Sequence, residues 1–223
     1  MPDTCTHFDH LQDQKLFDYI DHLVLAVPDL KIAMDEMHQR LGIQPVMGGR
    51  HPVWGTWNAL LAVGEATYLE LIAPDPDNHG TDFHRPEIFS ATEAPRMIGW
   101  FAKCSQLESA RAVLDSEGIQ IGGIKPGSRV LPDGRKLQWQ LTDPEVMVFD
   151  GIFPMLIDWA DSPHPASSAP VGCRLLELHL EHPEGGAVTR LLAAIGISIE
   201  VQTGSAPCIS AVIETPMGTL QLP

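Results

Sequence analysis

The sequence predicts an α+β fold of repeated β-α-β-β-β modules: two paired modules that form a curled mixed sheet around a cleft, and a third, smaller module. Three observations support this. A short apolar segment followed by an amphipathic, helix-like segment occurs three times. Each predicted helix ends in a Gly-Ile pair, and the three pairs are almost equally spaced, at 42–43, 118–119 and 196–197. Strand-like segments follow each pair. Such regularity is typical of one supersecondary unit used repeatedly.

The first module is predicted over residues 20–74. Its first strand, 20–27, is aliphatic and β-branched, and it ends at a proline. Asp29 has the side chain of a good helix N-cap, and Gly42 can adopt the left-handed conformation that ends a helix. Three further strands are predicted at 44–48, 56–63 and 68–73.

Residues 75–96 are predicted to be a linker or a lid over the cleft, because polar connections of this length are uncommon unless they have a function. The second module is predicted over 97–161. Ser105 and Glu108 have the spacing of a capping box at the start of its helix. Its strands are expected at 97–103, 125–130, 136–141 and 155–160, with a hairpin turn at Pro132-Asp133-Gly134.

A second linker, 162–171, is rich in proline, serine and alanine. The third module is predicted over 172–223. Its first strand is expected at 174–182, its helix at 186–195, and its remaining strands at 197–202, 208–214 and 219–222. The polar segment 1–19 is predicted to be an N-terminal extension.

Composition excludes several classes of function. The chain has 223 residues, is 44% hydrophobic and carries a formal net charge of −15. This charge argues against binding to nucleic acid or to an anionic membrane surface. The four cysteines are scattered without a CxxC pair, which favours reduced thiols in the cytoplasm. No apolar run is long enough to span a membrane, and no secretory signal is recognised.

Alternation along the strands of the first module singles out two polar residues. Strict alternation places Ile20, His22 and Val24 on one side of the first strand, opposite Leu23. In the last strand it places Glu70 on one side, between apolar neighbours. If both strands lie in one curled sheet, imidazole and carboxylate meet on its concave face. Such a pair is half of a site for Fe, Mn, Zn or Ni, or else a buried hydrogen-bonded pair with a structural role.

Several longer motifs carry a resemblance to a known family. They are IDHLVLAVPDL (20–30), GGRHPVWGTWNALLAVG (48–64), YLELIAPDP (68–76), LQWQLTDP (137–144) and FPMLIDWADSPHPA (153–166). Together they resemble the glyoxalase-like branch of the vicinal oxygen chelate superfamily, which includes glyoxalase I, dioxygenases and bleomycin-resistance proteins. The resemblance covers roughly residues 19–223.

The resemblance implies a set of metal ligands, because the superfamily takes its ligands from the first and last strands of two paired modules. The matching positions are His22 and Glu70 in the first module and Asp158 in the second. The fourth position falls on Gly99, which has no side chain to ligate a metal. Three ligands would leave open positions for water and substrate, as a Lewis-acid role requires.

A second candidate region lies beside the predicted hairpin at 48–58. Arg50 is expected to clamp a carboxylate or phosphate, and Trp54 or Trp57 to supply an apolar wall. The alternative is a turn with a surface arginine and core tryptophans. The residues expected to bind substrate are Arg50, His51, Trp54, Asn58, Trp139 and His164, the last as a proton carrier.

Three functions follow from these expectations. The first is a metal-dependent enzyme of the lyase, isomerase or dioxygenase type, which acts on a small oxygen-bearing organic substrate with His22 and Glu70 as catalytic residues. The second is a metal-free protein that binds or sequesters a small molecule, which Gly99 favours. The third is a role in assembly, because an odd number of modules leaves one copy without an internal partner and makes a homodimer possible.

Overall fold

The computed structural model describes residues 17–51, 54–77, 94–130 and 136–223. Most of the predicted lid at 75–96, the predicted hairpin turn at 132–134 and nearly all of the 1–19 extension lie outside these ranges. The exception in the extension is a short 3-10 turn, η1 (Phe17–Tyr19). No helix among the described residues is long and apolar enough to cross a membrane.

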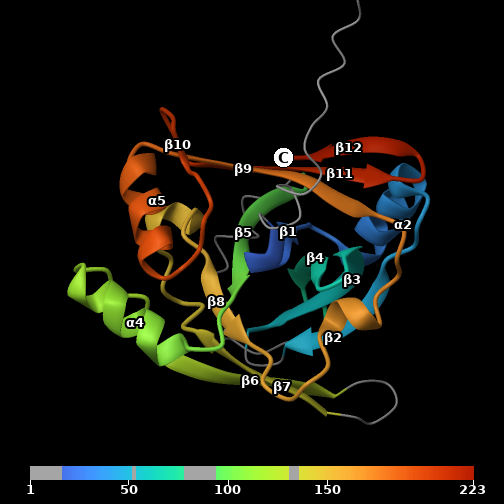
Figure 1. Ribbon diagram of the computed structural model, residues 1–223. Coiled ribbons are helices and arrows are strands. Elements are labelled where there is room, and N and C mark those ends of the chain that lie inside the picture. The colour runs from blue at the N-terminus through green and yellow to red at the C-terminus, as the bar shows by residue number, and fades with distance from the viewer. Residues whose placement is uncertain (1–16, 52–53, 78–93, 131–135) are drawn as a thin grey trace, which may run out of the picture.

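The described elements follow the order strand, helix and three strands in each of three units (Figure 1). The first unit comprises β1 (Ile20–Ala26), α2 (Leu30–Leu41), β2 (Val46–His51), β3 (Thr56–Gly64) and β4 (Thr67–Pro74). The second comprises β5 (Arg96–Lys103), α4 (Leu107–Ser116), β6 (Ile124–Val130), β7 (Lys136–Thr142) and β8 (Met155–Asp158), with η2 (Phe149–Gly151) before β8. The third follows η3 (Pro165–Ser167) and comprises β9 (Arg174–His182), α5 (Gly185–Ala194), β10 (Gln202–Thr203), β11 (Cys208–Thr215) and β12 (Gly218–Leu222).

The first two units form one eight-stranded mixed sheet with the order β2-β3-β4-β1-β5-β8-β7-β6. In each half the first strand pairs in parallel with the last, β1 with β4 and β5 with β8. The halves join through the antiparallel pair β1–β5. The outermost strands, β2 and β6, contact each other, so the sheet curls almost into a closed barrel (Figure 1). This confirms the predicted fold class and its curled sheet.

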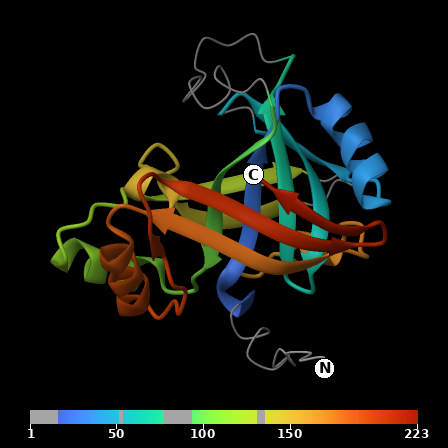
Figure 2. The same cartoon turned by 90° about the horizontal axis from the view of Figure 1, so that it is seen from above.

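The third unit has the same element order but a different sheet. Its four strands are ordered β10-β9-β11-β12, so its first strand does not pair with its last. Of the strand predicted at 197–202, only Gln202 lies in a strand, β10. The sheet crosses the outside of the large sheet (Figure 2). Leu175 and Ile213 from the third unit share one core cluster with Leu23 and Trp100. The apolar face of the third unit is therefore covered within this chain.

The helix ends show which capping predictions were correct. Asp29 Oδ1 accepts a hydrogen bond from the Ile32 amide at 3.0 Å, and Gly42 ends α2 in the left-handed conformation with φ of 75°. The predicted capping box at Ser105 and Glu108 is wrong. Gln106 is the N-cap residue of α4 and makes no side-chain capping bond, and Glu108 pairs with Arg111 on the exposed face instead.

A β-bulge in β1 changes which side chains face the cleft. The pairing of β1 with β5 runs from Ile20–Ala102 to His22–Phe101, so Asp21 is an extra residue in this register. Ile20 consequently lies in the core cluster with Leu23, not beside His22 as strict alternation predicted. The bulge also allows the Asp21 side chain to hydrogen-bond to the imidazole of His22.

Candidate functional site

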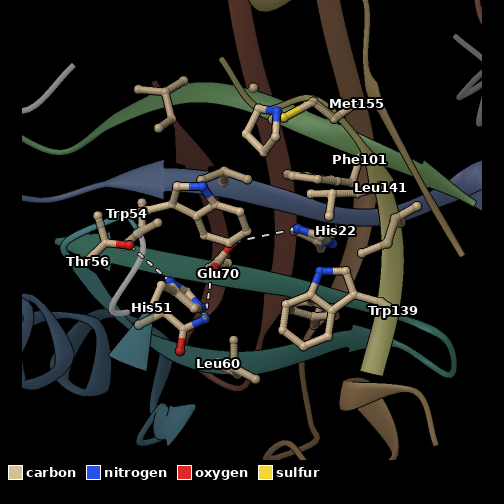
Figure 3. Close-up of a pocket in the computed structure, with 18 of the residues that line it drawn as sticks. His22, His51, Trp54, Thr56, Leu60, Glu70, Phe101, Trp139, Leu141 and Met155 are labelled. Atoms are coloured by element: carbon tan, nitrogen blue, oxygen red, sulfur yellow. Dashed lines mark hydrogen bonds and ion pairs between the residues drawn. The ribbon is translucent and has the colours of Figure 1, made fainter. Parts of the chain in front are cut away.

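The curled sheet surrounds a partly open cavity of about 170 Å³ (Figure 3). Its wall is mostly apolar and aromatic, and it contains His22 and Glu70, whose side chains point toward each other. Such a lining, with few polar groups, is typical of sites for small molecules. The lining residues include His22, His51, Trp54, Asn58, Tyr68, Glu70, Phe101, Arg129, Trp139 and Leu141.

The His22 imidazole is held between two aromatic rings. The Tyr68 ring stacks on one face with a centroid distance of 4.4 Å, and the Phe101 ring stacks on the other at 4.1 Å. His22 Nε2 lies 3.6 Å from Glu70 Oε2. The expected meeting of His22 and Glu70 thus occurs, with the imidazole plane fixed by packing.

Asp21 sets the orientation of His22 from behind. Its buried carboxylate is 2.7 Å from His22 Nδ1 and 3.0 Å from Trp159 Nε1. Burial acts to raise the pKa of Asp21, but hydrogen bonds from His164 and His22 outweigh it and lower the pKa from 3.8 to about 2. An ionised Asp21 only accepts hydrogen bonds, so Nδ1 of His22 carries a proton. In neutral His22 the lone pair of Nε2 then faces the cavity.

His164 supports Asp21 and does not line the cavity. The Ala166 amide donates to His164 Nδ1 at 3.2 Å, so in the neutral ring the proton is on Nε2, which lies 3.2 Å from Asp21 Oδ2. This position differs from the one expected for a residue that binds substrate as a proton carrier. Sequence reasoning missed Asp21 because alternation assigned it to the opposite side of the strand from His22.

Polar side chains of β2 and β3 hold Glu70 in place. Asn58 Nδ2 donates to Glu70 Oε1 at 2.5 Å and lies 3.5 Å from His51 Nε2. His51 Nδ1 is 3.0 Å from the Thr56 hydroxyl. His51 and Asn58, both expected in the site, therefore line the cavity as one network with Glu70.

Burial and nearby charges shift the pKa values of two further residues in the cavity wall. Burial lowers the pKa of His51, with Glu70 acting in the opposite direction and Arg129 adding to the decrease. Burial and the nearby carboxylates raise the pKa of Tyr68 well above 10.0. Tyr68 is therefore a neutral phenol at physiological pH and can donate a hydrogen bond.

The two predicted tryptophans lie in the cavity wall. Trp54 meets the edge of His51, and the Trp139 indole lies 5.1 Å from that of Trp159. Trp139 covers Gly127 of the neighbouring strand, where an added Cβ would be 2.1 Å from its Nε1. The glycine thus creates the space that the indole occupies.

Like His164, two other predicted residues lie away from the cavity. Arg50 pairs with Asp75 at 2.5 Å and with Asp77 at 2.5 Å on the exposed side, so its fork is already used. Asp158 accepts a hydrogen bond from the Ala160 amide at 2.8 Å and is not among the cavity-lining residues, whereas its neighbours Ile157 and Trp159 are. The structure thus does not bring Arg50 or Asp158 together with His22 and Glu70 at the cavity.

Arg129 of β6 lines the cavity and was missed by the sequence analysis. Its side chain is 8% exposed, and its Nε and Nη1 atoms have no hydrogen-bond partner among the described residues. Burial lowers its pKa, whereas the nearby Tyr68 and Glu70 raise it. No sequence signal marked this arginine, because only closure of the sheet brings β6 against β2.

The donor set does not form a complete metal site. One cation can bridge His22 Nε2 and Glu70 Oε2 at their separation of 3.6 Å, since metal–ligand bonds are about 2.1 Å long. However, no group of three or more His, Cys, Asp or Glu side chains among the described residues could hold a metal ion. The Arg129 cation also shares the cavity. The side chains thus supply two metal donors, His22 and Glu70, and the positive charge of Arg129 opposes the binding of a cation.

Comparisons show which known proteins this chain resembles in sequence or in fold. Residues 20–196 match the family described as "Glyoxalase-like domain". A hypothetical protein from Staphylococcus aureus has the same fold, with a TM-score of 0.65 at 12% identity over 92% of this chain and 98% of that one. Methylmalonyl-CoA epimerase from Mycobacterium tuberculosis is 23% identical over 62% of this chain and 85% of its own, with a TM-score of 0.40. The comparison with curated proteins gave no match.

Proposed function

The chain belongs to the glyoxalase-like domain family of the vicinal oxygen chelate superfamily, and we propose that it is an enzyme that moves a proton on a small oxygen-bearing organic substrate. The observation that carries this proposal is the position of His22 Nε2, 3.6 Å from Glu70 Oε2, inside an apolar cavity. Low polarity around such a pair strengthens its electrostatic effect on a bound molecule.

In the proposed reaction, the Glu70 carboxylate takes a proton from a carbon next to a carbonyl group. His22, protonated on both ring nitrogens, donates its Nε2 proton to the carbonyl oxygen as negative charge develops there. The products of this step are an enol, a neutral imidazole and a protonated Glu70. Return of the proton to the same or a neighbouring carbon would complete an isomerisation or epimerisation.

Asp21 contributes by stabilising the protonated imidazole. Its hydrogen bond to Nδ1 at 2.7 Å fixes the ring, and its pKa of about 2 keeps it ionised while His22 changes charge. A buried carboxylate in this position orients a catalytic histidine without taking its proton. Asp21 is thus proposed as a positioning residue.

Deuterium exchange tests this proposal across a broad set of candidate substrates. The protein is incubated in D₂O with pools of small carbonyl compounds, and mass spectrometry detects carbon-bound deuterium. We expect exchange in the wild type to exceed that of His22→Ala and Glu70→Gln by about 100-fold or more. Asp158→Asn is the matched carboxylate control and should retain exchange. Exchange that both cavity variants retain would contradict the assignment.

A divalent metal, Fe, Mn, Zn or Ni, is the finer alternative. His22 Nδ1 is held by the Asp21 carboxylate, as the second ring nitrogen of a metal-ligating histidine usually is. His22 and Glu70 would hold the ion, as the two side-chain donors that the described residues supply there. Calorimetric titration of chelator-treated protein with Zn²⁺ or Mn²⁺ tests this. Binding that His22→Ala and Glu70→Ala lose and Asp158→Ala retains would support it.

A metal-free binding protein is the second candidate function. It is favoured by Gly99, which pairs with Val24 at the seam between β1 and β5 and gives the cavity wall no polar side chain at this position. In this case His22 and Glu70 would only hydrogen-bond a ligand. Tight binding of a small molecule that the protein leaves unexchanged and unconverted would favour this function over catalysis.

A further inference from the structure

Arg129 is a buried cation whose donors are only partly satisfied. The side chain is 8% exposed, and neither Nε nor Nη1 has a hydrogen-bond partner among the described residues. Burying a guanidinium is costly unless its donors are satisfied, and arginines this deeply buried are almost always paired. The unsatisfied donors are therefore a property of the cavity that requires an explanation.

The neighbouring strand provides space for this arginine. A Cβ at Gly48 would lie 2.7 Å from Arg129 Nη1, and one at Gly49 would lie 3.4 Å from its Cδ. Two consecutive glycines in β2 thus leave a slot through which the side chain from β6 reaches the cavity. Any other residue at position 48 would displace the guanidinium.

The polar groups beside Glu70 do not satisfy Arg129. Glu70 accepts from Asn58 through Oε1 and faces His22 with Oε2. Asn58 must turn its amide nitrogen to Glu70, and its own Oδ1 has no hydrogen-bond partner in the described part of the chain. That oxygen would lie 2.3 Å from a Cβ at Gly48, so it borders the same slot. Donor and acceptor capacity is thus left over at one end of the cavity.

We infer that Arg129 binds the carboxylate of a small organic acid, which makes such an acid the substrate class of the proposed enzyme. This inference rests on the proposed function for the identity of the site, but the binding itself is independent of turnover. A planar carboxylate matches the guanidinium fork and neutralises its charge among mostly apolar side chains. A phosphate dianion would place two negative charges near Glu70, and the single Arg129 guanidinium would balance only one of them.

The rest of the cavity defines the remainder of the acid. Phe101, Trp139 and Leu141 line it with apolar surface, and its volume of about 170 Å³ suits an aliphatic or aromatic body of modest size. The reacting carbon and oxygen would lie between Arg129 and the His22–Glu70 pair. Asn58 Oδ1 would accept a hydrogen bond from a hydroxyl group near the carboxylate.

A matched pair of probes tests the inference. Phenylacetate and phenylacetamide have the same apolar body and differ in charge, and calorimetry gives the affinity of the full chain for each. We expect the wild type to bind phenylacetate at least tenfold more tightly, and Arg129→Met to lose this preference. Arg50→Gln, which changes the guanidinium already paired with Asp75 and Asp77, should keep it. Loss of the preference in Arg50→Gln, or its persistence in Arg129→Met, overturns the inference.

Two further measurements separate binding from folding. If Arg129 is held ready for a ligand, Arg129→Met should unfold at the same temperature as the wild type or higher, and a clear decrease would indicate a structural role and overturn the inference. In the wild type, the Nε–H resonance of Arg129 should shift when phenylacetate is added and not with phenylacetamide. Tighter binding of inorganic phosphate than of phenylacetate would overturn the choice of a carboxylate.

The proposed function can be tested separately from the proposed carboxylate site. Arg129-dependent binding of phenylacetate should persist in His22→Ala, whereas the deuterium exchange described above should not. If binding follows Arg129 but no exchange depends on His22, the carboxylate site stands and the catalytic proposal fails. If exchange depends on His22 but binding shows no preference for the carboxylate, the reverse holds.

Discussion

Asp21 and His22 are consecutive in a β-strand, yet their side chains are hydrogen-bonded to each other, with 2.7 Å between Asp21 Oδ1 and His22 Nδ1. In a regular strand, neighbours point to opposite faces. The bulge between Ile20 and His22 removes this separation and places a buried carboxylate behind the imidazole. The orientation of the proposed catalytic histidine thus depends on one irregular residue.

Replacement of Asp21 by Asn should change how stability depends on acid. Folding lowers the pKa of Asp21 from 3.8 to about 2, so the carboxylate stabilises the fold fully above pH 3.8 and loses this effect as pH falls toward 2. Urea unfolding at pH 5, 4, 3 and 2 measures this. We expect the stability advantage of the wild type over Asp21→Asn to shrink by roughly 2 kcal/mol between pH 4 and pH 2. A constant advantage would contradict the assignment.

His51 should report the charges in the cavity. Burial lowers its pKa below 6.5, Glu70 acts to raise it and Arg129 to lower it. Arg129→Met should therefore raise the pKa of His51 toward 6.5, and Glu70→Gln should lower it further. Histidine-ring NMR over pH 4–8 gives the midpoints. Because the folded state resists protonation of His51, this residue should also reduce stability as pH falls below 6.5. Equal midpoints in both variants would show that His51 does not sense these charges.

A methyl group at position 127 should disturb the cavity wall. A Cβ there would be 2.1 Å from Trp139 Nε1, so the indole must move. We expect Gly127→Ala to lower the free energy of unfolding by about 1–3 kcal/mol and to change the tryptophan fluorescence. Gly123→Ala is the matched control, because its Cβ would meet nothing within 4 Å, and its effect should stay within about 0.5 kcal/mol. Equal effects of the two changes would exclude this packing.

The third unit should unfold together with the large sheet. Ile213 of β11 is fully buried in the core cluster that also contains Leu23 and Trp100. Ile213→Ala should lower the free energy of unfolding by about 2–5 kcal/mol and preserve a single transition. Val171→Ala, at a residue 76% exposed, is the control and should have an effect within about 0.5 kcal/mol. A separate early transition in Ile213→Ala would show that the third unit is an independent domain.

Local sequence signals predicted much of the fold. Alternating apolar residues, Asp29 and Gly42 place β1 and α2 correctly, because strand periodicity and helix caps depend on neighbours within a few residues. The capping box predicted at Ser105 was wrong because the N-cap residue is Gln106, one position later, and the local pattern did not distinguish the two positions. The strand predicted at 197–202 is replaced by the short strand β10. In the third unit the strands pair in a different order from those of the first two units.

The sequence by itself determined the repeated modules and the His22–Glu70 pair, because periodicity fixes which residues share a face of a regular strand. The tertiary structure decided the rest of the site. A bulge turned Asp21 toward His22, closure of the sheet brought Arg129 of β6 to Gly48 of β2, and the pleat of β8 turned Asp158 away from the cavity. These outcomes depend on strand register and on contacts between distant strands. The spacing of residues along the chain reveals neither of them.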